Sequence, residues 1–136
     1  MALKVDKQGR LKVSEADIER TCTELLELDG WRSFKMEENF SERKMKRTGE
    51  KGMPDRLYLR YNWAYEFRVT YRRVIADVLW IEWKANGGKP SLAQRNWIAA
   101  ETKRGAMVLL AGTNFPASIE GFKEWYRNSG LMRNRL

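Results

Sequence analysis

The chain has 136 residues, a formal net charge of +8 at pH 7, a pI near 9.8, no histidine and one cysteine. This length suits a single domain, residues 1–136, with one hydrophobic core. No apolar run approaches the roughly 20 residues of a membrane span and no secretory signal is evident, so we expect no membrane association and a cytoplasmic location. The absence of histidine excludes imidazole bases, HExxH zinc sites and Ser-His-Asp triads.

The charge and the missing residue types together narrow the function. A strongly basic chain favours a polyanionic partner, with nucleic acid ahead of a membrane surface because no basic amphipathic segment stands out. Any catalysis must depend on carboxylates and lysine, whose oxygen ligands suit Mg²⁺ or Mn²⁺, whereas one cysteine without histidine disfavours zinc. Cys22 lies on the apolar side of a helical pattern, which predicts a buried thiol rather than a reactive one.

The N-terminal third predicts a helix and a strand after a loosely ordered lead-in, residues 1–13. Ser14 with Asp17 resembles a capping box and Gly30 provides a stop, so a helix is expected over residues 14–29, followed by a strand over 31–36. Glu19 lies at the edge of the apolar stripe of this helix. A solvated helix charge is the ordinary interpretation of such a residue.

Residues 37–51 lose periodicity and predict a mobile basic loop. Its basic residues are Arg43, Lys44, Lys46, Arg47 and Lys51. The loop leads into Gly52-Met53-Pro54-Asp55, where proline fixes the backbone and removes a ladder donor just before a strand. Asp55 is therefore expected to project from a strand entrance.

Alternate residues are apolar or aromatic from Leu57 to Tyr71, while the residues between them include Arg68 and Arg72. This stretch is too long for one ordinary strand, so we expect a long hairpin or bent ribbon that turns near residues 62–64. Its aromatic face is expected to pack on the core or across a subunit interface. Stacking on nucleic-acid bases is the alternative.

Residues 78–84 read as a largely buried strand interrupted by Glu82 and Lys84. Strand alternation places Trp80, Glu82 and Lys84 on one face. Burying charge is costly unless it is paired or binds a metal. An ion pair on the strand surface and a functional acid with its lysine are the two interpretations.

The rest of the chain predicts a loop over 86–90, a helix from Ser91 to Arg104, a buried strand over 106–111, an amphipathic helix over 115–126 and a basic tail, residues 128–136. Gln94 is the third helical residue after Ser91, which completes a second capping box.

The order helix, strand, strand with Pro54-Asp55, strand with Glu82-Trp83-Lys84, helix, strand resembles the PD-(D/E)XK nuclease superfamily. Glu19 in the first helix, the glycine before Met53-Pro54-Asp55, and Gln94 make the chain most similar to the VRR-NUC branch, whose stand-alone members occur in phages and bacteria. The resemblance covers roughly residues 14–112. Two features depart from the pattern: the segment between Asp55 and Glu82 is longer than the minimum, and Trp83 stands in the middle of the Glu-x-Lys triplet.

The resemblance implies a restriction-endonuclease-like αβββαβ core, a small mixed sheet flanked by helices, with an extended β-ribbon between its second and third strands. It implies a site in which Asp55, Glu82 and the backbone carbonyl of Trp83 bind Mg²⁺, or Mn²⁺ as a substitute. Glu19 would orient a water or complete a second cation site. Lys84 would hold the nucleophile or neutralise phosphate charge, and Gln94 would support Lys84 or the scissile phosphate.

The expected function is that of a metal-dependent endonuclease that acts on DNA and recognises its shape rather than its base sequence. The resemblance implies branched DNA such as a Holliday junction as the substrate. The residues expected to grip phosphates are Arg43, Lys44, Lys46, Arg47, Lys51, Arg68 and Arg72. Symmetrical cutting of two strands suits a homodimer. The alternatives are a non-catalytic nucleic-acid-binding protein that retains the fold, and an enzyme acting on RNA.

Overall fold

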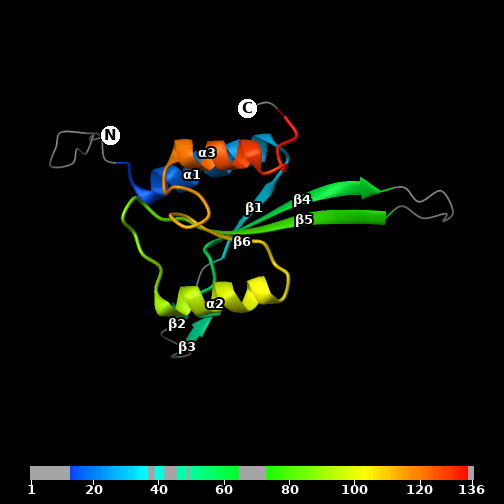
Figure 1. Cartoon of the computed structure of the whole chain (residues 1–136). Coiled ribbons are helices and arrows are strands. Elements are labelled where there is room, and N and C mark those ends of the chain that lie inside the picture. Colours follow the sequence, from blue (N-terminus) through cyan, green and yellow to red (C-terminus); the bar gives the residue numbers. More distant parts are fainter. Residues whose placement is uncertain (1–12, 37–38, 42–45, 49, 65–72, 135–136) are drawn as a thin grey trace.

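A four-stranded mixed sheet lies between helices (Figure 1). The computed structural model describes residues 13–36, 39–41, 46–48, 50–64 and 73–134. Within them the elements are α1 (Glu15–Leu28), β1 (Arg32–Lys35), β2 (Asn39–Ser41), β3 (Lys46–Thr48), β4 (Arg56–Ala64), β5 (Arg73–Glu82), α2 (Leu92–Lys103), β6 (Val108–Leu110) and α3 (Ile119–Asn128). The sheet order is β1-β4-β5-β6, antiparallel except for the parallel pair β5 and β6. The chain is thus α/β with a small mixed sheet, as predicted.

Helices α1 and α3 lie side by side on one face of the sheet and α2 lies on the other (Figure 1). Leu79, Ile81 and Trp83 point to the first face and are buried, which confirms the alternation predicted for this strand. Trp80 points to the second face and meets Trp97 of α2 edge to face, with ring centroids 5.1 Å apart. The core consists of Ile18, Cys22, Leu26, Trp31, Tyr58, Leu79, Ile81, Trp83, Leu109, Ala111, Phe115, Phe122 and Tyr126.

Side-chain caps define where the helices begin. The Ser14 hydroxyl accepts a hydrogen bond from the backbone N–H of Asp17, as the sequence predicts for α1. The third helix begins at Ile119 rather than at residue 115, because Ser118 caps it from an extended conformation. Cys22 is buried as expected, and burial raises the pKa of its thiol to about 12.

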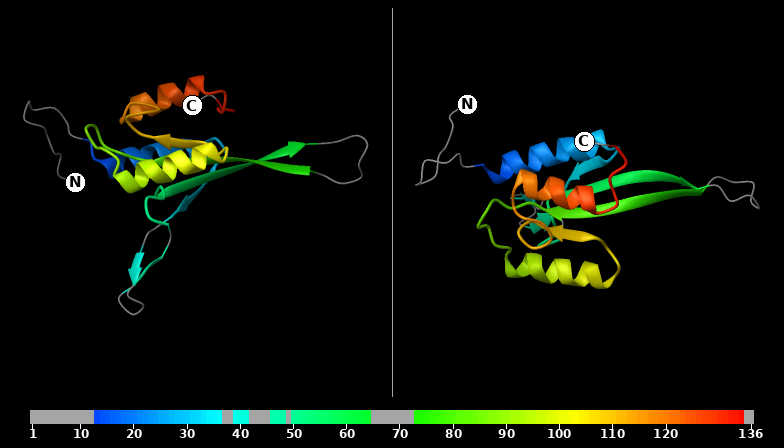
Figure 2. Two further views of the ribbon diagram at one scale, coloured as in Figure 1. Left: turned by 60° about the horizontal axis from the view of Figure 1, so that its bottom comes forward. Right: turned by 45° about the horizontal axis from the view of Figure 1, so that its top comes forward.

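The predicted hairpin is formed by β4 and β5, which extend together beyond the helices (Figure 2). Their register runs from Arg56 opposite Ile81 to Ala64 opposite Arg73. Because β4 continues through Ala64, the prediction of a turn near residues 62–64 is wrong. The ribbon is also not a separate insertion, since it prolongs two strands of the sheet itself.

The face of the ribbon that includes Leu59 and Tyr61 was expected to pack on the core or across a subunit interface, and the expectation of core packing is wrong. Tyr58 and Arg60 are buried against the α1 and α3 side, whereas Tyr61 is 51% exposed. Tyr58 satisfies its hydroxyl with Thr23 and Trp83, and Arg60 is paired with buried carboxylate, so both residues can enter the core despite their polar atoms. The more apolar alternate residues therefore face the α2 side.

The segment predicted as a loop over residues 37–51 contains the antiparallel pair β2 and β3. Three-residue strands are too short to establish an alternating pattern, which is why the sequence did not indicate them. Residues 1–12 of the predicted lead-in and 135–136 of the tail lie outside the described residues. No helix in the described ranges is long and apolar enough to cross a membrane.

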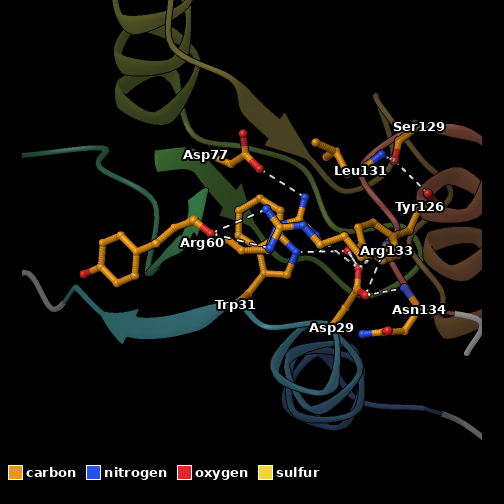
Figure 3. A network of polar contacts seen from close by, with 10 residues as sticks. Asp29, Trp31, Arg60, Asp77, Tyr126, Ser129, Leu131, Arg133 and Asn134 are labelled. Atoms are coloured by element: carbon orange, nitrogen blue, oxygen red, sulfur yellow. Dashed lines mark hydrogen bonds and ion pairs between the residues drawn. The ribbon is translucent and has the colours of Figure 1, made fainter. Parts of the chain in front are cut away.

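A buried carboxylate, Asp29, ties the C-terminal residues to the sheet (Figure 3). It accepts hydrogen bonds from the Tyr126 hydroxyl, from the backbone N–H of Asn134 at 2.8 Å and from Nη1 of Arg60 at 3.2 Å. Arg60 in turn stacks on Trp31, with its Cζ 4.4 Å from the ring centroid. The network therefore joins α1, the ribbon, α3 and the C-terminal segment.

Asp29→Asn is expected to lower the free energy of unfolding by about 3–5 kcal/mol at pH 7, because it leaves Arg60 without its buried counter-charge. Burial alone raises the pKa of Asp29, but the hydrogen bonds from Tyr126, Arg133 and Asn134 bring it below its ordinary 3.8. The difference between wild type and variant should therefore shrink as the pH falls below that value.

Urea unfolding followed by circular dichroism measures this effect. Glu120→Gln removes an exposed charge paired with Lys123 and should change the stability by less than about 1 kcal/mol. Equal effects of the two substitutions would contradict a central role for Asp29.

Candidate active site

The carboxylate of Glu82 is buried at the end of β5. Its side chain is 3% exposed, and pairing with β6 fixes its backbone. Oε1 accepts a hydrogen bond from Nε2 of Gln94 at 2.8 Å and lies 3.4 Å from Nζ of Lys84. Oε2 is also buried, and no partner for it occurs in the described part of the chain. One oxygen is thus held by the protein while the other remains available to a ligand.

The surroundings of Glu82 oppose its negative charge. Burial is the main cause, and the charges of Asp55 and Glu15 add to it, so the pKa of Glu82 rises to about 7 although Lys84 lowers it. A buried acid crowded by other acids favours a proton or a cation.

Asp55 reaches the same end of the sheet through a tightly packed loop. Arg56 lies opposite Ile81 in the last pair of the β4–β5 ladder. The adjacent residues Asp55 and Glu82 therefore lie at the same end of the two strands. Gly52 has φ +87°, and a Cβ on it would lie 2.2 Å from the carbonyl oxygen of Ala93 in α2. Only glycine allows this approach, which explains why it precedes the Met53-Pro54-Asp55 segment.

The pKa of Asp55 is also raised. Burial and the charge of Glu19 raise it, while Lys35, Lys84 and Arg56 act in the opposite direction. The predicted acids and lysine therefore act on one another electrostatically, although they are far apart in the sequence.

Gln94 completes the predicted capping box, but its second contact differs from the expected one. Its side-chain oxygen accepts from the backbone N–H of Ser91 at 2.9 Å, which completes the predicted capping box. Its Nε2 donates to Glu82 rather than to Lys84. Because the cap fixes the side chain, Gln94 holds Glu82 in one orientation.

Glu19 has a different partner from the expected one. Its Oε1 lies 2.8 Å from Nε of Arg56, in a partly buried ion pair. Glu15, one turn earlier on α1, has a pKa raised first by burial and then by Asp55 and Glu19, with Lys84 opposing. Glu15 was not predicted as a site residue because its sequence position is that of an ordinary first-turn acid, although its spacing of four residues from Glu19 places both on one helix face.

The donors at this site suit a hard cation only in part. Asp55 and Glu82 supply carboxylate oxygen, the ligand type that Mg²⁺ and Mn²⁺ prefer, and Oε2 of Glu82 has no partner among the described residues. Within the described ranges, however, no three acidic, histidine or cysteine side chains lie close enough to hold a metal. A cation here would complete its shell with water.

The predicted phosphate-gripping residues are only partly described. Lys51 is exposed in the loop before Gly52. Lys46 and Arg47 belong to β3, and Arg43, Lys44, Arg68 and Arg72 lie outside the described residues. Comparison of the chain with protein-family models, with curated proteins and with solved structures finds no significant match.

Glu82→Gln is expected to stabilise the protein in EDTA at pH 8 by more than about 1 kcal/mol, since a shift of one pKa unit corresponds to about that energy. The raised pKa means that the folded state binds the proton more tightly than the unfolded state. The stability of the wild type should therefore fall as the pH rises from 4.5 through about 7.

Thermal unfolding at several pH values measures this effect, and Mn²⁺ should raise the melting temperature of the wild type but not of Glu82→Gln. Glu101→Gln, at an acid on α2 paired with Arg104, serves as the control. If the wild type instead gains stability relative to Glu82→Gln between pH 5 and 8, the raised pKa of the buried Glu82 carboxyl is contradicted.

Proposed function

We propose that the protein is a Mg²⁺-dependent endonuclease that hydrolyses DNA phosphodiester bonds. The observation that carries the proposal is the buried carboxylate of Glu82, held on one oxygen by Gln94 and Lys84 and unpartnered on the other among the described residues. A fold without ligand function gains nothing from such a group, because a buried carboxylate oxygen without a hydrogen-bond partner destabilises it.

The order of elements supports the same proposal. Apart from the small β2–β3 sheet and the C-terminal helix α3, the described chain forms a helix, three antiparallel strands, a helix and a strand parallel to the last of the three. This order is the one expected of a restriction-endonuclease-like αβββαβ core, and it is compatible with the resemblance to the VRR-NUC branch of the PD-(D/E)XK superfamily.

The residues at the end of the sheet have separable roles in this proposal. Asp55, Glu82 and the Trp83 carbonyl would hold the ion, which when bound supplies Lewis-acid activation in a protein that has no histidine base. Lys84 places its ammonium beside Glu82, where it stabilises negative charge that develops on the phosphate. Gln94 keeps the open oxygen of Glu82 in place.

The net charge of +8 supports nucleic acid as the substrate. Phosphate contacts position a protein on DNA without specifying bases, so we propose recognition of shape, with branched DNA such as a Holliday junction as the substrate. A cytoplasmic location in a bacterial or phage-infected cell stays a prediction.

The proposal is tested with supercoiled plasmid and a synthetic four-way junction, each incubated with Mg²⁺, Mn²⁺ or EDTA. Glu82→Ala and Lys84→Ala should each reduce cleavage by at least about 100-fold, because the first removes a ligand of the ion and the second removes the ammonium that stabilises charge on the phosphate. Lys103→Ala removes an exposed charge at the far end of α2 and should leave cleavage unchanged.

The same assay separates the alternatives. Binding to DNA without cleavage in any metal would favour the non-catalytic protein, and a clear preference for a matched RNA junction would favour the RNA enzyme. Cleavage that persists in EDTA or in Glu82→Ala would refute the mechanism.

We further propose that the protein acts as a homodimer through the α2-side face of the ribbon. On this face Val78 lies opposite Leu59 and is 45% exposed, and Tyr61 beside them is 51% exposed. Exposed apolar side chains on adjacent strands can be buried by an equivalent face of a second copy.

Val78→Glu is expected to convert a dimer into a monomer in sedimentation equilibrium experiments, because it places a charge in the apolar contact. Ile75→Glu is a matched control, since Ile75 is 44% exposed on the opposite face of the same strand. A monomeric wild type, or equal behaviour of the two variants, would contradict this interface.

A further inference from the structure

The ion pair between Glu19 and Arg56 lies beside the proposed site and occupies Glu19, the acid that a second cation would otherwise engage. Nε of Arg56 donates to Oε1 of Glu19 at 2.8 Å, and the two side chains are only 23% and 20% exposed. Arg56 directly follows Asp55 in the chain, and Glu19 lies on α1 four residues after Glu15.

A second polar contact between α1 and β4, one helical turn after Glu19 and two strand residues after Arg56, holds this ion pair in place. Thr23, four residues after Glu19, bonds through its hydroxyl to the Tyr58 hydroxyl at 2.7 Å, and Tyr58 lies two residues after Arg56. Helix and strand periodicities place each pair of residues on one face, so α1 and β4 are joined by two successive polar contacts. Trp83 donates to the same Tyr58 hydroxyl at 2.9 Å, which connects the contacts to the Glu82 strand. Glu19 is therefore positioned toward Arg56.

The balance of charge agrees with this arrangement. The acids that act on one another are Glu15, Glu19, Asp55 and Glu82, and the cationic side chains among them are Lys35, Lys84 and Arg56. When all four acids are ionised around a bound metal, one divalent ion leaves a single positive charge for the phosphate, whereas two ions would leave the site strongly positive before DNA binds.

Extending the proposed function, on which this step rests, we infer that the site binds a single divalent cation and that the guanidinium of Arg56, held by Glu19, takes the place of a second one. The contact with Glu19 uses one of the five N–H donors of Arg56. A guanidinium offers fixed donors that match phosphate oxygens, so Arg56 supplies the charge that a second ion would supply.

The test counts Mn²⁺ bound to the full-length chain by electron paramagnetic resonance of the free ion. The wild type should bind roughly one Mn²⁺ per chain. Arg56→Gln should bind two, because it releases Glu19 as an oxygen ligand, and the double variant with Glu19→Gln should return to one. Arg56→Lys keeps a positive charge beside Glu19 and should stay at one.

Two results would overturn this inference while leaving the proposed function intact: a wild type that binds two ions, or an Arg56→Gln variant that still binds one. A wild type that binds none would instead reject the metal site itself, and with it both proposals. If Arg56→Gln does not fold, Glu19→Gln decides. Its Mn²⁺ affinity should stay within about threefold of the wild type, and a loss of tenfold or more would identify Glu19 as a ligand and reject the role of Arg56.

Discussion

The fixed position of one buried acid, Glu82, is the constraint on which the proposed site depends. Its neighbours in the chain, Ile81 and Trp83, are both buried in the core, so the carboxylate cannot turn toward solvent without disrupting the packing. The capped Gln94 holds one of its oxygens from the α2 side. The tight packing of Gly52 against α2 then brings Asp55 to the same end of the sheet. Several elements together thus keep the charged carboxylate of Glu82 buried, which none of them could do alone.

Asp29 and Glu82 are the buried acids among the described residues, and their surroundings shift their pKa values in opposite directions. Asp29 receives hydrogen bonds from side chains, backbone N–H groups and Arg60, so its pKa falls although burial opposes this (Figure 3). Glu82 has one oxygen without a partner in the described structure, and its pKa rises to about 7. A carboxylate that serves the fold is expected to be fully satisfied by protein groups. The contrast therefore separates a structural acid from one that is available to a ligand.

Local patterns predicted the helices, the buried strand and the residues near Glu82 because each depends on nearby sequence: caps at Ser14 and Ser91, and alternation around Glu82. The inner face of the ribbon was not predictable in this way. Arg60 looks like a surface residue, and its burial depends on Asp29 and Trp31, which lie between α1 and β1, and on Asp77 of β5. The partner of Glu19 was equally hidden, since nothing in the sequence indicates that Arg56 faces α1.

The two long strands connect the proposed chemistry to the proposed interface. Asp55 and Glu82 lie at one end of the β4–β5 ladder, and its far end at Ala64 is about 27 Å away at the usual rise per residue. The Asp29 and Arg60 network clamps the ribbon near its middle to α1, α3 and the C-terminal segment. Because the clamp restricts bending, two ribbons joined face to face would hold their two sites at a set separation. An enzyme that selects DNA by shape needs such a fixed spacing, since the positions of the two scissile phosphates, and not the bases, then decide which junction fits.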